Sequence, residues 1–188
     1  VMGLPLLDIK IDKAAIARLV EQINLIDTGR AKVMNSLWLP DVLREITPSE
    51  KRFALGAELL EASLPLFANE AVLERDWKKR KEFETPWGRG VALKTTASNL
   101  DGYAYARGFV LVIQIEPERG WHTFRGLAGS EVDLTPVYEE LLKVDAKASW
   151  FLHHAKQMLL NGSRSAPNVV PSRLSTDRLI EIVHKVAR

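Results

Sequence analysis

The pattern of apolar and polar positions predicts helices up to about residue 84 and strands after it. After Asp12, apolar residues recur at the three- and four-residue spacing of one buried helical face, and Gly29 ends the pattern. The segment Thr47–Glu50 combines a hydroxyl cap, a proline at the first helical position and a glutamate. It predicts a helix that runs to about Ser63. We expect Pro65 to interrupt or kink this helix, because proline cannot donate the next backbone hydrogen bond.

The next predicted helix runs from Leu66 to Phe83, and its last turns carry the basic run Lys78–Lys81, which suits the negative end of the helix dipole. The pattern then changes to short apolar and alternating runs, which are typical of strands. Val91–Thr96 and Gly108–Ile115 are the first two predicted strands. The second is apolar on both faces and is therefore expected to be central in a sheet.

A hairpin, two further helices and one more strand complete the pattern. Trp121–Gly126 alternates apolar and polar residues after a turn, and it is predicted to pair antiparallel with the strand before it. The cap and proline at Thr135 predict a helix to about Val144, and Trp150–Leu152 predicts a strand. The last helix is predicted from Ser175.

These elements predict an α+β fold, in which N-terminal helices precede a small mixed or antiparallel sheet with packed helices. We expect a helical region over residues 1–84 and an α+β substrate-binding region over residues 85–188, which together could form one compact unit. The composition, 46% hydrophobic in 188 residues, is that of a globular chain with a core of ordinary size.

Composition and charge exclude several classes of protein. The chain has no cysteine, so disulfides, thiolate metal sites and a thiol nucleophile are excluded. The longest apolar runs are far shorter than the roughly 20 residues of a membrane-spanning helix, so no membrane segment is expected. We expect a cytoplasmic protein, and the sequence leaves open whether it forms a homo-oligomer. The net charge of +2 argues against a protein dedicated to wrapping nucleic acid.

The segment from Ala148 to Arg164 carries the densest group of residues that could bind a ligand. An apolar strand is followed by two histidines and a lysine, whose imidazole and ammonium groups could bind an anion such as phosphate. A polar turn comes next, and its backbone N–H groups could bind the same anion. The candidate substrate-binding residues are His153, His154, Lys156, Asn161, Gly162, Ser163 and Arg164. Adjacent histidines on a strand point to opposite sides, which argues against a metal site made of both. The alternative is a strand end with solvated polar side chains and an ordinary turn.

Three other features each have a functional and a structural interpretation. Asp27 could reach a metal ion from the end of its helix, although hard cations require several oxygen ligands and an aspartate is also common at a helix end. The run Lys78–Lys81 could contact phosphates or be a solvated face. Trp121–Arg125 has the aromatic and basic residues of a strand that binds single-stranded nucleic acid, or it is a half-buried hairpin. No phosphate loop, nucleophile elbow, zinc spacing or dinucleotide fingerprint is present.

Two segments together resemble a known family. Ala15–Gly29 resembles the helix after the catalytic core of DHH-type phosphoesterases, in the branch related to the melanocyte-proliferating-gene protein. Phe151–Ala155, followed by Asn161 and Gly162, is similar to the C-terminal segment of that branch, in which a histidine follows an apolar strand. The predicted hairpin and the last helix occur in the corresponding order.

The resemblance implies cleavage of phosphodiesters that depends on manganese or magnesium, with a phosphate-containing nucleotide or short nucleic acid as substrate. It implies that Asp27 matches a metal-ligand aspartate and that His153 binds the substrate. The chain has no Asp-His-His triplet and no early Asp-x-Asp pair, so it would match only the C-terminal, substrate-binding part of such an enzyme. We therefore expect the catalytic half, if one exists, to precede residue 1. The alternative is a non-catalytic module that binds nucleic acid or a protein, with salt-sensitive contacts through Arg125 and Lys78–Lys81.

Overall fold

The computed structural model of this chain describes residues 13–14, 16–17, 20–21 and 43–186, and the chain divides into two compact units, residues 1–71 and 72–188. The helix predicted after Asp12 falls largely outside the described residues, and so does Asp27. Its described residues are helical.

Helix α3 (Ser49–Trp77) contains the boundary between the two units. It begins close to the predicted start, and the guanidinium of Arg52 donates two hydrogen bonds, of 3.0 and 2.9 Å, to the carbonyl of Ile46 just before it. The predicted interruption at Pro65 is wrong, because α3 continues through this residue. Residues rich in alanine, leucine and glutamate favour helix on both sides of the proline.

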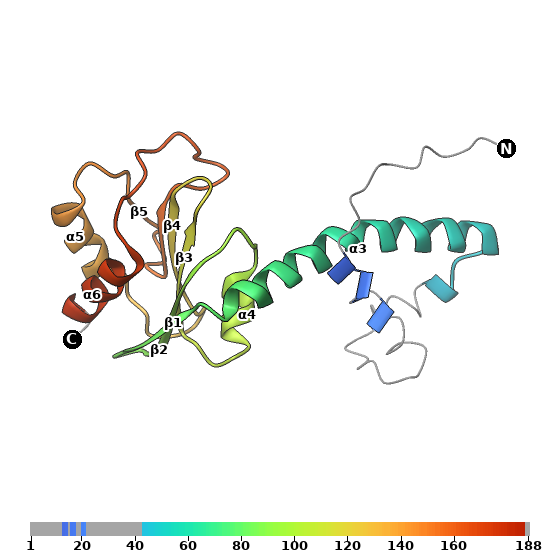
Figure 1. The fold of residues 1–188 in the computed structure, drawn as a ribbon, viewed down its shortest axis with the longest axis horizontal. Helices are drawn as coiled ribbons and strands as arrows, with labels where there is room; N and C mark the ends of the chain where they lie inside the picture. The colour runs from blue at the N-terminus through green and yellow to red at the C-terminus, as the bar shows by residue number, and fades with distance from the viewer. Residues whose placement is uncertain (1–12, 15, 18–19, 22–42, 187–188) are drawn as a thin grey trace. The chain divides into compact units, whose positions relative to one another are not determined.

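The second unit is built on one six-stranded sheet (Figure 1). Its strands are β1 (Lys81–Thr85), β2 (Gly88–Lys94), β3 (Leu111–Glu116), β4 (Trp121–Gly126), β5 (Phe151–Leu152) and β6 (Met158–Asn161). They lie in the order β1-β2-β3-β4-β6-β5, and β2 and β3 are parallel whereas every other neighbouring pair is antiparallel. Helix α4 (Leu100–Tyr105) lies in the connection that a parallel pair requires.

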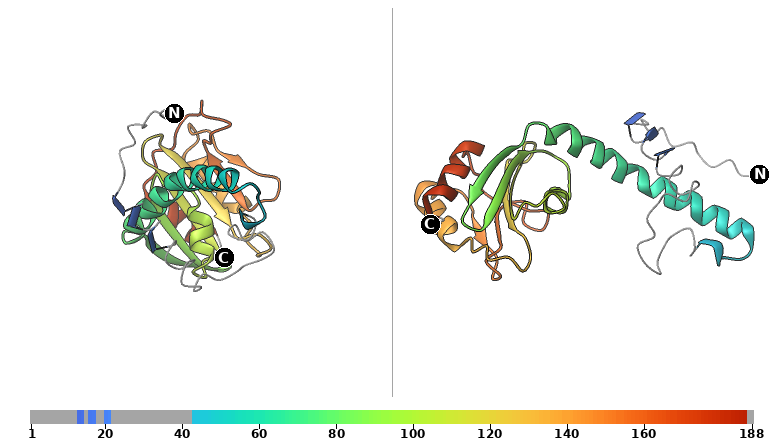
Figure 2. Two further views of the ribbon diagram at one scale, coloured as in Figure 1. Left: turned by 90° about the vertical axis from the view of Figure 1, so that its right-hand side faces the viewer. Right: turned by 90° about the horizontal axis from the view of Figure 1, so that it is seen from below.

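Helices cover the two faces of this sheet unequally. Helices α5 (Thr135–Val144) and α6 (Thr176–Val186) pack on one face, and α4 lies on the opposite face (Figures 1 and 2). The first face carries the larger core, in which Phe124 and Leu159 are fully buried with inward residues of α5 and α6. The smaller core on the second face joins β2 and the start of β3 to α4 and Leu73 of α3. None of the helices in the described part of the chain covers the β4–β6 part of the second face, and the candidate site lies there.

The predicted α+β fold with a mixed sheet is confirmed. The hairpin of β3 and β4 and the helices α5 and α6 lie where the sequence places them. The predicted helix to Phe83 is wrong beyond Trp77: Lys81–Thr85 is the edge strand β1, and Phe83 is buried against the sheet. The basic run Lys78–Lys81 therefore follows the helix and enters β1. None of the described helices has both the length and the apolar character needed to cross a membrane.

Candidate anion-binding site

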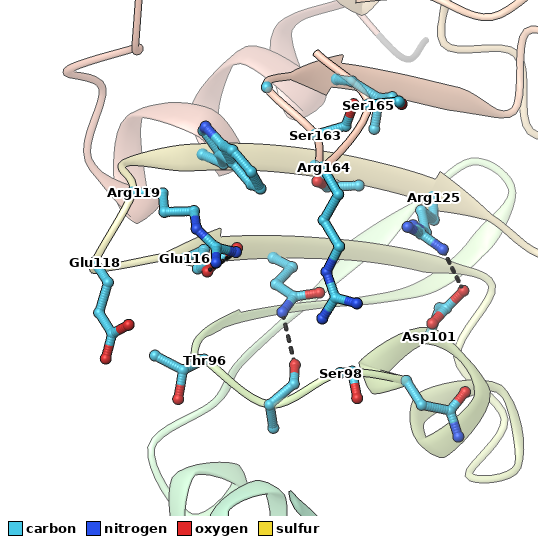
Figure 3. Close-up of a pocket in the computed structure, with 17 residues that line it drawn as sticks. Thr96, Ser98, Asp101, Glu116, Glu118, Arg119, Arg125, Ser163, Arg164 and Ser165 are labelled. Atoms are coloured by element: carbon cyan, nitrogen blue, oxygen red, sulfur yellow. Dashed lines mark hydrogen bonds and ion pairs between the residues drawn. The ribbon is translucent and has the colours of Figure 1, made fainter. Parts of the chain in front are cut away.

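A cavity of about 670 Å³ lies over the uncovered part of the second sheet face (Figure 3). Its floor is made by the side chains of β3 and β4 that point away from the larger core, because side chains alternate along a strand. All of them except Trp121 are polar or charged. They are Gln114, Glu116, Trp121, Thr123 and Arg125. Cavities of this size are typical of sites for small ligands.

One wall of the cavity is the loop Thr96–Asn99, which follows the carboxyl end of β2. The side-chain amide of Gln114 donates to the carbonyl oxygens of Ala97 at 2.9 Å and Thr95 at 3.4 Å, and these bonds hold the loop against β3. Because β2 and β3 are parallel, the loop lies outside the carboxyl ends of two parallel strands, where ligands commonly bind in α/β sheets.

The facing wall is the loop Gly162–Ser165, which follows β6. Gly162 has φ +96°, and a Cβ atom built on it would lie 2.2 Å from Cδ1 of Trp121, so only glycine fits here. The Ser163 hydroxyl accepts from the amide of Ala166 at 3.1 Å and lies 3.1 Å from the hydroxyl of Ser165. This tight turn presents Arg164, whose side chain extends across the cavity toward the Ser98 side (Figure 3).

The charges that line the cavity are not equally neutralised. Arg125 pairs with Asp101 at 3.0 Å, and Arg119 pairs with Glu116 at 3.0 Å while its guanidinium lies 4.7 Å from the centre of the Trp121 ring. Arg164 makes no hydrogen bond or ion pair with any residue in the described part of the chain. The cavity therefore holds one guanidinium whose five donors are available to an anion.

Asn161 is the last residue of β6, directly before the loop Gly162–Ser165, and its side chain has a structural role among the described residues. Its side chain is fully buried, its amide nitrogen donates to the carbonyl oxygens of Ser149 and Val170 at 3.0 Å each, and its oxygen accepts from the amide of Ser172 at 2.6 Å. Both N–H groups of the side-chain amide and one lone pair of its oxygen are therefore bonded to the backbone. Asn161 therefore fixes the end of β6 and does not face the cavity.

The predicted histidines and lysine lie at the other end of β6. His153, His154 and Lys156 form the turn between β5 and β6, and the four residues of β6 separate this turn from Gly162. At about 3.4 Å per residue the strand separates the two groups by roughly 10 Å or more. The Lys156 ammonium lies 3.4 Å from the Asp133 carboxylate, and the two imidazole rings lie 3.9 Å apart. None of the three residues lines the cavity.

The side chains of the hairpin strand Trp121–Arg125 alternate between the two faces of the sheet. Phe124 and His122 are buried in the larger core, so Phe124 has no face available to a base. Burial lowers the pKa of His122, although its ring nitrogens lie 3.0 and 3.2 Å from the carbonyl oxygens of Gly120 and Leu174, which favour the protonated form. Only Trp121, Thr123 and Arg125 reach the cavity.

The comparisons with known proteins assign no family. No protein-family model matches this chain, and no curated protein matches it. Among the residues that the structure describes, no group of three or more histidine, aspartate or glutamate side chains could hold a metal ion. Asp27, the metal ligand that the resemblance implies in this chain, lies outside the described residues, so the manganese or magnesium site stays a prediction.

Several residues of the cavity were not predicted as site residues from the sequence. The loop Thr96–Asn99 forms one wall of the cavity, Gln114 forms part of its floor, and Arg119 is a further cation. One signal for them exists in the sequence: Gln114 interrupts an otherwise apolar central strand, and a buried polar residue in such a position needs partners. The parallel pairing of β2 and β3 brings the loop Thr96–Asn99 to the hairpin. The spacing of apolar residues along the sequence does not reveal this pairing.

Proposed function

We propose that residues 72–188 bind a phosphate-bearing substrate in the cavity between β3, β4 and the loop Gly162–Ser165. The observation that carries the proposal is Arg164, a guanidinium that enters the cavity without a partner among the described residues, while the two other arginines there are paired. Arginine offers a planar fork of donors that matches the oxygens of a phosphate. The hydroxyl groups of Ser163 and Ser165 lie on the same wall and could add weaker bonds.

The proposal keeps part of the predicted site. Gly162, Ser163 and Arg164 line the cavity and are assigned to the substrate, whereas Asn161 is assigned to the scaffold. His153, His154 and Lys156 are not assigned to this phosphate. As the sequence resemblance implies, we propose that the unit is the substrate-binding portion of a DHH-like phosphoesterase of the cytoplasm, acting on nucleotides or short nucleic acids.

The described residues are assigned binding and no catalytic step. We expect the 188-residue chain to bind phosphate compounds and to leave a nucleotide phosphodiester uncleaved in the presence of manganese. Rapid hydrolysis by this chain alone would refute the assignment of a binding portion. A second candidate, a non-catalytic nucleic-acid-binding module, predicts binding that depends on Arg125 and the basic run Lys78–Lys81 instead of Arg164.

The test is calorimetric titration of the full chain with inorganic phosphate at low ionic strength, where screening is weak. Arg164→Gln is expected to lower the affinity about tenfold, since a charge-assisted hydrogen bond at an exposed site contributes the lower part of about 1.5–3 kcal/mol. Arg173→Gln is the matched control, because Arg173 is also an exposed arginine, makes no contact with a described carboxylate and does not line the cavity. Equal affinities for both variants would refute the proposal.

A further inference from the structure

A second hollow, of about 460 Å³, opens beside the cavity and is lined by Arg119, Trp121, Arg164 and Pro167. The first three of these residues also line the cavity, so the two hollows adjoin at the Trp121 ring and the Arg164 side chain. Arg119 comes from the turn between β3 and β4, and Arg164 comes from the loop after β6 (Figure 3). A ligand whose phosphate binds Arg164 in the cavity can therefore extend into the second hollow.

The walls of the second hollow suit the face of an aromatic ring. Trp121 and Pro167 offer apolar surfaces, and the two charged residues are both arginines, whose guanidinium groups are planar. Aromatic rings, among them nucleic-acid bases, stack on aromatic side chains and on guanidinium planes. No carboxylate is found among the described residues that line this hollow, so nothing in the lining repels the phosphate of the same ligand.

Arg119 is held by its edge, and one of its faces is accessible. Its Nη1 donates to the Glu116 carboxylate at 3.0 Å, and its guanidinium carbon lies over the Trp121 ring, 4.7 Å from the ring centre. The N–H bonds of a guanidinium lie in its plane, so the bond to Glu116 leaves both faces uncovered. The Trp121 ring covers one face. The Arg119 side chain is 50% exposed, which leaves the other face accessible to a ligand.

The ring beneath Arg119 is itself fixed in position. The backbone of Gly162 packs so closely on the Trp121 ring that an added Cβ atom would lie 2.2 Å from Cδ1. The Glu116 carboxylate fixes the guanidinium and also neutralises it, whereas Arg164 has no partner in the described part of the chain. The two arginines therefore differ in role: Arg164 is the group for an anion, and Arg119 is a preformed flat surface for a ring.

We infer that the second hollow binds the base of a nucleotide whose phosphate lies at Arg164, and that the base stacks on the outer face of Arg119 in the order Trp121, Arg119, base. The inference rests on the proposed function, because the phosphate at Arg164 holds the base beside this hollow. It adds a site for the base, and it separates nucleotides from other phosphate compounds as the substrate. Because the contact is with the face of the base, the identity of the base matters little.

The test is calorimetric titration of the full chain with inorganic phosphate, ribose 5-phosphate and AMP at low ionic strength. AMP is expected to bind about tenfold more tightly than ribose 5-phosphate, because only AMP adds a stacked base. Arg119→Lys keeps the positive charge and removes the planar group, so the ratio of the two affinities is expected to fall about threefold. Arg107→Lys is the matched control, because Arg107 also lies over an aromatic ring, 3.4 Å from the centre of Tyr103, and lines neither hollow.

Two results would overturn the base site. One is equal binding of AMP and ribose 5-phosphate by the wild-type chain, and the other is an affinity ratio that Arg119→Lys lowers no more than Arg107→Lys does. The proposed function fails by a different result, namely that Arg164→Gln binds inorganic phosphate as tightly as wild type. Phosphate binding that depends on Arg164, without any preference for AMP, would therefore refute the base site alone.

Discussion

Replacing Asn161 by alanine tests how the wall that carries Arg164 is held in place. The side chain of Asn161 is fully buried and bonds to three backbone groups of two separate segments, Ser149 and Val170–Ser172. Alanine removes all three bonds at once. The amide of Ser172 is buried and would be left without this acceptor, which costs about 1–3 kcal/mol, and the two bonds to carbonyl oxygens contribute about 0.5–1.5 kcal/mol each.

The expected loss in the free energy of unfolding of the sheet unit is therefore about 2–6 kcal/mol. Urea unfolding of the full chain, followed by tryptophan fluorescence, measures it, because Trp150 is buried in the larger core of this unit and becomes exposed on unfolding. Asn168→Ala is the control, since Asn168 is exposed and makes no hydrogen bond in the described residues. If Asn161→Ala costs no more than Asn168→Ala, the assignment of Asn161 to the scaffold is wrong.

Three more predictions concern single positions. Gly162→Ala brings a Cβ against the Trp121 ring at positive φ, so we expect the free energy of unfolding in urea to fall by about 1–3 kcal/mol and phosphate binding to weaken. A variant as stable as wild type would contradict this packing. Since burial lowers the pKa of His122, the unfolded chain binds its proton first, and the free energy of unfolding should fall as the pH drops below about 6.5. His122→Gln should flatten this dependence between pH 7.5 and 5.5, and an equally steep profile would exclude His122 as its source. Because Glu118 lines the cavity, Glu118→Gln should tighten inorganic phosphate binding about twofold, and unchanged or weaker binding would show that Glu118 does not face the ligand.

Much of the fold follows from local patterns. Helices α5 and α6 and the hairpin of β3 and β4 have strong periodicity and clear turn residues, and they appear where the sequence predicts them. Strand β1 has only Phe83 as an inward apolar residue, between charged neighbours that are typical of an edge strand, so its segment is easily read as the end of a helix. Strand β6 lies between β5 and β4; it pairs with β4, more than thirty residues earlier, and no local pattern in Met158–Asn161 reveals this second partner.

The candidate site was predictable only in part, and for a similar reason. The residues Gly162–Arg164 follow a strand and have the composition of an anion-binding turn, which is visible in the sequence. The strand β6, however, separates them from His153 and His154, so a group that is compact in the sequence is divided between two ends of a hairpin. Whether Asn161 faces the ligand or the backbone depends on the packing of Val170–Ser172 against it, and this is a tertiary contact.

The most direct test of the account is the position at which phosphate binds to the chain. Backbone amide chemical shifts, recorded while inorganic phosphate is titrated into the full chain, report that position residue by residue. We predict that the shifts concentrate in the two walls of the cavity, residues 96–99 and 162–165, and that Arg164→Gln moves their titration midpoint to about tenfold higher phosphate. Shifts confined to the turn His153–Lys156, or shifts at the cavity whose titration midpoint is unchanged in Arg164→Gln, would contradict the central claim.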